Sequence, residues 1–89
     1  MADDMRAKAM ELLEAMYEHR VNVGGKVDGE ELVNPYEVTH YVGLDPGTHP
    51  YNDAVNYLVD KGAIEWASVQ VGDSTFYKVT RRGLEMLGH

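Results

Sequence analysis

The 89-residue sequence contains no cysteine, only three prolines and few basic residues. Without cysteine the chain can form neither a disulfide nor a thiolate metal site, and cysteine usage leaves its redox compartment open. No apolar run approaches the roughly 20 residues of a membrane-spanning helix. The opening MADDMRAKAM is too acidic and too often interrupted by charge to be a signal peptide. We therefore expect a cytoplasmic protein.

Acidic residues outnumber basic ones by fifteen to eight, which gives a formal net charge of −7. This balance argues against indiscriminate binding to nucleic acid or to an anionic membrane. Residues 1–45 hold ten acids and four bases, whereas residues 46–89 hold five acids and four bases. The second half is therefore nearly neutral. Hydrophobic residues make up 44% of the chain, and a chain of this length has room for one core, so we expect a single domain over residues 1–89.

The most informative stretch runs from Thr48 to Trp66, where a short amphipathic helix is predicted to stop at a glycine and turn into a strand. Thr48 is the better candidate N-cap, and Pro50 suits the first helical turn. Gly62 follows the last turn, where a residue tolerant of positive φ is preferred. The apolar face, at three- and four-residue spacing, comprises Tyr51, Ala54, Val55 and Leu58.

Two helices are predicted before this stretch. The first spans residues 3–20, and a loop over residues 22–33 follows it with at most a short strand at 31–33. The second starts at Asn34, which caps it with Glu37 three residues later, and ends at Gly43. Turn-forming residues then lead to the helix at residue 48, so the two short helices are expected to form a helix-turn-helix unit.

A hairpin and a final helix are predicted after Gly62. The strands 63–71 and 75–80 meet at a turn over Gly72, Asp73 and Ser74. Tyr77 and Val79 are expected to point inward, with Lys78 outward, and Ile64 and Trp66 share one face of the first strand. Thr80 is the expected cap of a short helix over residues 81–87.

Two segments of the second half carry a resemblance to a known fold family. The run Leu58 to Ile64 resembles the ending "L-x-x-x-G-h-h" of the third helix of winged helix-turn-helix domains. The run Phe76 to Leu87 resembles the ending "Y-x-L-T-x-x-G-x-x-h-L" of bacterial regulators of the MarR, PadR and ArsR type. Together they cover roughly residues 48–87. The resemblance implies an α+β winged-helix domain ordered helix, short strand, helix, helix, strand, strand, helix, whose third helix enters the major groove of DNA.

On that basis the outward residues of the third helix are the candidates for DNA contact. Asparagine side chains can bind adenine, and tyrosine can contact phosphate or stack. Asp53 and Asp60 share the surface and would be repelled by phosphates. The predicted hairpin corresponds to the wing of such a domain, and Lys78, Arg81 and Arg82 cluster at its base. This cluster fits phosphate contacts and a solvated face about equally well. The candidate DNA-binding residues are Asn52, Asn56, Tyr57, Lys61, Lys78, Arg81 and Arg82.

Enzymatic activity is not expected. The histidines are His19, His40, His49 and His89, and no pair has the i, i+4 spacing of a helical zinc site. His40, His49 and Asp45 could converge on a metal, but three polar residues around a turn are the favoured interpretation. No serine lies in a nucleophile elbow. We therefore predict no catalytic residue, no metal and no cofactor.

Two hypotheses for function stay open. The first is a transcription-regulator domain that binds double-stranded DNA weakly, or only as a homodimer formed through the terminal helices. The second is a winged-helix module that docks a partner protein and binds no DNA. Four tyrosines in the helix-turn-helix unit favour the second, unless they are simply half-buried with their hydroxyls at the surface. These are Tyr36, Tyr41, Tyr51 and Tyr57.

Overall fold

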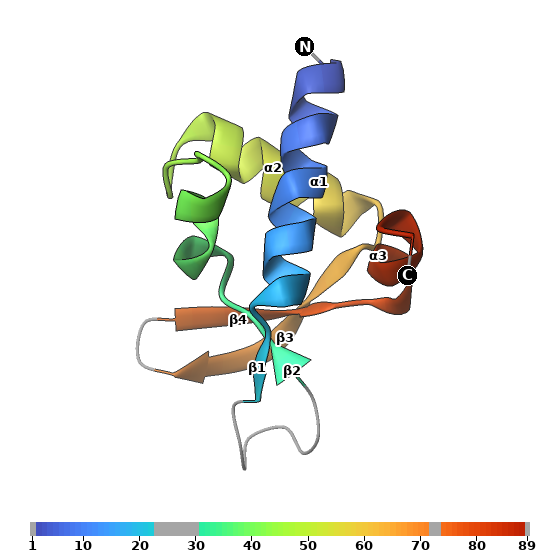
Figure 1. Ribbon diagram of the computed structural model, residues 1–89. Coiled ribbons are helices and arrows are strands. Elements are labelled where there is room, and N and C mark those ends of the chain that lie inside the picture. Colours follow the sequence, from blue (N-terminus) through green and yellow to red (C-terminus); the bar gives the residue numbers. More distant parts are fainter. Residues whose placement is uncertain (1, 23–30, 72–73, 89) are drawn as a thin grey trace.

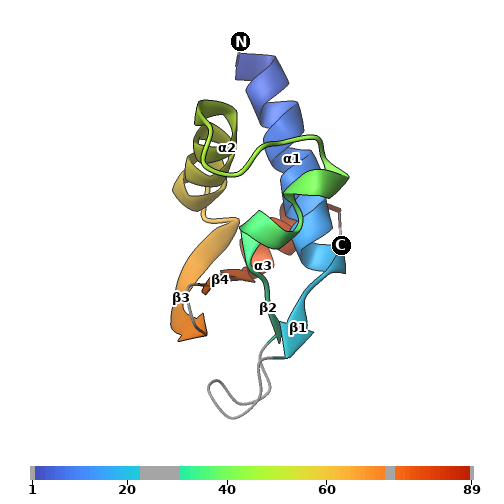
Figure 2. The same ribbon diagram turned by 90° about the vertical axis from the view of Figure 1, so that its left-hand side faces the viewer.

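Helices α1 (Ala2–Glu18) and α2 (His49–Asp60) lie side by side, and the antiparallel strands β3 (Ile64–Val71) and β4 (Ser74–Val79) cross beneath them (Figures 1 and 2). The computed structural model describes residues 2–22, 31–71 and 74–88. Its class is α+β, as the sequence predicts. The other elements are β1 (Val21–Asn22), β2 (Glu31–Leu32), the 3₁₀ turns η1 (Pro35–Glu37) and η2 (Thr39–Tyr41), and α3 (Arg81–Met86).

The core lies between α1, α2 and the start of the hairpin. Helix α1 buries Leu12, Leu13 and Met16 completely. Helix α2 buries the whole apolar face predicted for it, so that prediction is confirmed. Burying one such aliphatic side chain stabilises the fold by about 1.5–3 kcal/mol. Packing of the apolar stripes on the two helices is therefore the main force that holds α2 in place.

The predicted hairpin is present over its described residues, except that Ser74, predicted to lie in the turn, is the first residue of β4 and pairs with Val71. Ile64 pairs with Val79 and Trp66 with Tyr77, and an irregularity follows Trp66. Ile64 and Val79 are buried and Tyr77 is half-buried, whereas Trp66 is 59% exposed. The hairpin face that carries these four residues is thus buried by the core only at the end next to α2. The predicted turn residues Gly72 and Asp73 lie outside the described residues.

A short strand attaches the hairpin to the first half of the chain. The predicted strand at 31–33 is present as β2, which pairs with β1. Val33 then forms a bridge to β4, in which its backbone N–H and carbonyl bond the carbonyl and N–H of Tyr77 at 2.9 and 2.8 Å. The sequence did not indicate β1, because a two-residue strand has no periodicity to detect. Most of the predicted loop, residues 23–30, lies outside the described residues.

The prediction of an α-helix between Asn34 and Gly43 is wrong. Residues 35–41 form two successive 3₁₀ turns instead of one α-helix, and Val38 between them has φ −110° and ψ 0°. The predicted cap is confirmed, since Asn34 Oδ1 accepts the Tyr36 N–H at 3.1 Å. The Thr39 hydroxyl donates to the Tyr36 carbonyl, a local bond that competes with α-helical pairing. The non-helical backbone at Val38 therefore divides the segment into two 3₁₀ turns, each closed by its own short-range bonds.

A tight joint connects α2, β3, β4 and α3. Thr48 is the N-cap residue of α2, but its hydroxyl donates to the Asp45 carbonyl instead of accepting a helical N–H. Gly62 ends α2 with φ +73°, as predicted. Thr80 caps α3 by accepting the Gly83 N–H at 3.1 Å, and its hydroxyl donates to the Gly62 carbonyl. The end of α2 and the start of α3 are therefore bonded through one threonine.

Candidate functional site

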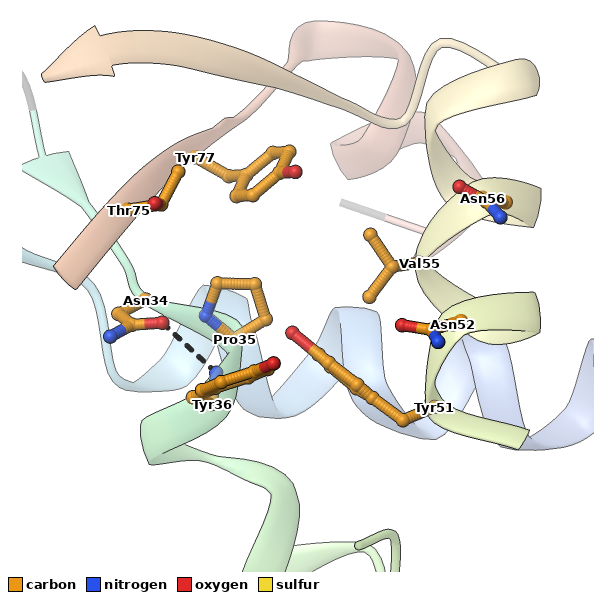
Figure 3. A pocket seen from close by; sticks show the side chains of 9 residues that line it. All are labelled: Asn34, Pro35, Tyr36, Tyr51, Asn52, Val55, Asn56, Thr75 and Tyr77. Atoms are coloured by element: carbon orange, nitrogen blue, oxygen red, sulfur yellow. Dashed lines mark hydrogen bonds between the residues drawn. The ribbon is translucent and has the colours of Figure 1, made fainter. Parts of the chain in front are cut away.

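An open groove of about 400 Å³ lies between α2, η1 and β4 (Figure 3). Its walls come from three separate segments of the chain, which the core and the bridge from Val33 to Tyr77 hold together. Two residues predicted for DNA contact, Asn52 and Asn56, lie on its α2 side. The lining residues are Asn34, Pro35, Tyr36, Tyr51, Asn52, Val55, Asn56, Thr75 and Tyr77.

Local structure explains how each wall presents its side chains. The Asn34 cap holds the backbone at Tyr36, whose side chain is 53% exposed. Helix α2 places Tyr51 and Val55 toward the core, while Asn52, one residue after Tyr51, is exposed. Period-2 alternation puts Tyr77 on the opposite face of β4 from Lys78. The groove thus combines buried residues with exposed polar ones.

Three tyrosines dominate the groove. The rings of Tyr36 and Tyr51 are 5.0 Å apart between centroids and inclined at 60°, an arrangement that aromatic pairs favour. Tyr51 is only 5% exposed, and its hydroxyl points into the groove (Figure 3). Burial, and then the nearby phenols of Tyr36 and Tyr77, raise the pKa of Tyr51 well above its usual value of 10.0. Its hydroxyl therefore stays protonated, and able to donate a hydrogen bond, further into the alkaline range than that of an ordinary tyrosine.

The raised pKa of Tyr51 predicts a loss of stability in alkali. Because the folded state holds this proton more tightly than the unfolded state, its contribution is present below the unfolded pKa of 10.0 and is lost as the pH rises above it. At one pH unit above that value the loss is about 1.4 kcal/mol. Urea unfolding at successive pH values should show this extra slope in the parent protein and not in Tyr51→Phe. Tyr41→Phe, at an exposed ring, should keep the slope; an equal slope in Tyr51→Phe would contradict the assignment.

The lining of the groove includes no aspartate, glutamate, lysine or arginine. Its polar groups are carboxamides and hydroxyls. Asp53 and Asp60 nevertheless lie close to it, because they stand three residues before and four residues after Asn56 on the surface of α2. Both are exposed. The chemistry is therefore that of a neutral, aromatic binding surface with acid beside it.

The other predicted DNA-binding residues lie outside the groove. Tyr57 is half-buried against the core, and the Lys61 Nζ stands 5.7 Å from the centre of its ring. Lys61, Arg81 and Arg82 are exposed around the joint between α2 and α3. Lys61 is about 7.5 Å along the helix axis from Asn56. Lys78 is half-buried on β4. The fold thus gathers three bases at one end of α2 and the asparagines further along it.

A second aromatic cluster joins α1 to η2. His19 stacks on Tyr41 with ring centroids 4.2 Å apart, and His40 contacts the same ring at 4.0 Å. Sequence patterns could not indicate the stacking of His19 on Tyr41, since these two residues are 22 positions apart and come from different parts of the fold. No group of three or more His, Asp or Glu placed to hold a metal occurs within residues 2–22, 31–71 and 74–88. The hypothetical set His40, His49 and Asp45 therefore does not form one.

Comparison of the chain with protein-family models, curated proteins and solved structures found no match. Function has to be inferred from the fold and from the chemistry of the groove. Of the helices in the described ranges, none combines the length and apolar character that crossing a membrane requires. The exposed face of α2 and the groove beside it are the features that need a functional explanation.

Proposed function

We propose that the chain is a winged-helix domain that binds double-stranded DNA through α2, weakly as a single copy and more strongly as a homodimer. The observation that carries this proposal is the placement of α2. Its apolar face packs against α1, while Asn52, Asp53 and Asn56 are exposed on the other side. A helix held in this way can enter a major groove without unfolding.

The order of elements supports the winged-helix assignment. A long helix, two short strands, two 3₁₀ turns and α2 precede an antiparallel hairpin and a terminal helix. The backbone bridge between Val33 and Tyr77 attaches the short strand to the hairpin, which would serve as the wing. In this assignment η1 and η2 occupy the place of the second helix. The resemblance in residues 58–64 and 76–87 falls on the end of α2 and on β4 with α3.

The contacts of such a domain divide between bases and phosphates. Asn52 and Asn56 stand one turn apart and would face base edges, where asparagine pairs with adenine. Lys61, Arg81 and Arg82 would bind phosphates near the joint between α2 and α3. Three cations per copy give only a modest counterion-release term. A second copy would double the contacts, and we place the dimer interface on the terminal helices.

Titration of a labelled duplex at two salt concentrations tests the proposal. We expect log affinity to fall with log salt at a slope of about −0.9 for each phosphate neutralised, or about −2.7 per copy for three contacts. Replacing Arg81 and Arg82 by alanine should reduce that slope by about 1.8, whereas Arg6→Ala on the far helix should leave it almost unchanged. Fluorescence anisotropy measures the affinity of each variant at both salt concentrations and so gives the slope. An unchanged slope in the double variant would remove these arginines from the interface.

The second candidate is a docking module that binds a protein and no DNA. One observation favours it: the groove with three tyrosines has an uncharged lining, and the exposed residues of α2 include Asp53 and Asp60, which phosphates repel. Absence of duplex binding at low salt would transfer the assignment to this module. The same titration therefore separates the two candidates.

A further inference from the structure

We propose that the groove between α2, η1 and β4 binds an extended, proline-rich peptide that has basic residues beside its prolines. This inference rests on the lining of the groove and holds whether or not the domain also binds DNA. Its starting point is the meeting of aromatic rings with uncharged hydrogen-bonding groups on one open surface (Figure 3).

The lining matches the surface chemistry of a polyproline II helix. Such a peptide packs its rings against aromatic side chains, and its backbone carbonyls are free because it makes no internal hydrogen bonds. Tyr36 and Tyr77 supply rings at the two sides of the groove, and Tyr51 supplies a protonated hydroxyl between them (Figure 3). Asn52 and Asn56 add carboxamide donors at the spacing of one helical turn. The peptide is also ordered before binding, which lowers its entropic cost.

Other occupants fit this lining less well. An amphipathic helix satisfies its own backbone and would leave the hydroxyl and carboxamide groups without partners. An added β-strand needs a free edge, but beside the groove the backbone of β4 is already bonded to Val33 at Tyr77. A charged small molecule would find no ionised partner among the lining side chains. An extended segment with free carbonyls uses both the rings and the donors.

Charge determines what should flank the prolines. Asp53 and Asp60 are exposed on the two sides of Asn56 along α2, and the whole chain has a net charge of −7. Arginine or lysine next to the prolines would meet these carboxylates and be drawn to the surface. Trp66, which is 59% exposed and pairs with Tyr77 across the hairpin, is a further exposed aromatic residue outside the groove. The partner is therefore a basic, proline-rich segment.

The test is a fluorescence titration of the whole protein against a labelled peptide of two arginines followed by eight prolines. We expect saturable binding with a Kd below about 1 mM. Tyr36→Ala should raise this Kd about tenfold because it removes an aromatic anchor. Tyr41→Ala is the matched control, since Tyr41 is equally exposed, at 56%, but lies outside the groove. It should bind as the parent does. Thermal melting of both variants checks that each is folded.

Two further measurements distinguish specific binding of the prolines from non-specific electrostatic attraction of the arginines. A peptide with the same arginines and a glycine-serine tail should bind at least tenfold more weakly, and Asp53→Asn with Asp60→Asn should weaken the proline peptide several-fold. The same double variant should strengthen duplex DNA binding, so the two activities respond in opposite directions. Equal binding of both peptides, full binding by Tyr36→Ala, or no saturation of the proline peptide would each overturn the proposal.

Discussion

Substituting Gly83 by alanine is expected to destabilise the domain by about 3 kcal/mol, because the added methyl has no space. Gly83 lies buried in the first turn of α3. A Cβ there would overlap the carbonyl oxygen of Ala63 and would stand 3.1 Å from Val79 Cγ1. That oxygen already accepts the Thr80 N–H at 2.9 Å, so it cannot move away without breaking the joint. Either α3 or the start of β3 must shift.

Urea unfolding followed by circular dichroism would measure the effect. A loss of about 3 kcal/mol corresponds to a fall in melting temperature of about 12–24 °C for a domain of this size. Arg82→Ala is the matched control, since it changes the preceding, exposed residue of the same helix and should stay within about 0.5 kcal/mol of the parent. If Gly83→Ala were as stable as Arg82→Ala, the result would contradict the inference that α3 packs on Ala63 without space for a methyl group.

Sequence patterns predicted those parts of the fold that local signals determine. The helix ending at Gly62 combines a proline in its first turn, an apolar face and a glycine that adopts φ +73°. Each signal acts within a few residues, so no tertiary information was needed. The segment 35–41 shows the limit, because its cap at Asn34 was predicted correctly while its helix type was not. The cap depends on one local hydrogen bond, but an α-helix needs uninterrupted helical backbone, and Val38 with φ −110° and ψ 0° interrupts it.

The candidate site was predictable only on its α2 side. Helical periodicity placed Asn52 and Asn56 outward, and both are exposed. The meeting of Tyr36 with Tyr51 and Tyr77 depends on how η1 and β4 pack against α2, which no spacing in the sequence encodes. The bridge from Val33 to Tyr77 sets that packing, and it joins residues 44 positions apart. For the same reason the fold leaves Trp66 exposed, although alternation alone puts it on the same face as the buried Ile64.

The two proposals make opposite demands on one face of α2. Phosphates are repelled by Asp53 and Asp60, whereas a basic peptide is attracted to them. Asn52 and Asn56 are shared, since they are the base-contacting residues of one proposal and groove donors in the other. A bound peptide would therefore exclude DNA from α2. Both activities require α2 to keep its position against α1, and its anchor in the core can be tested directly.

Replacing Leu58 by alanine is expected to cost about 3 kcal/mol, because it opens a cavity where α2 meets the rest of the core. Leu58 is completely buried, as are Leu12 and Met16 of α1 within the same core. The total stability of a domain this size is only about 5–15 kcal/mol, so this loss is a large fraction of it. Thermal melting should show a fall of about 12–24 °C.

Val59→Ala provides the matched comparison, because it truncates the next residue of the same helix at a side chain that is 42% exposed. It should change the stability by less than about 1 kcal/mol. Where the Leu58→Ala variant is still folded, loosening of α2 should weaken peptide and duplex binding together, since both use Asn52 and Asn56, six and two residues before it on the same helix. Equal losses of stability in the two variants would mean that Leu58 is not an anchor. The face that presents Asn52 and Asn56 would then have to be held in place by other contacts.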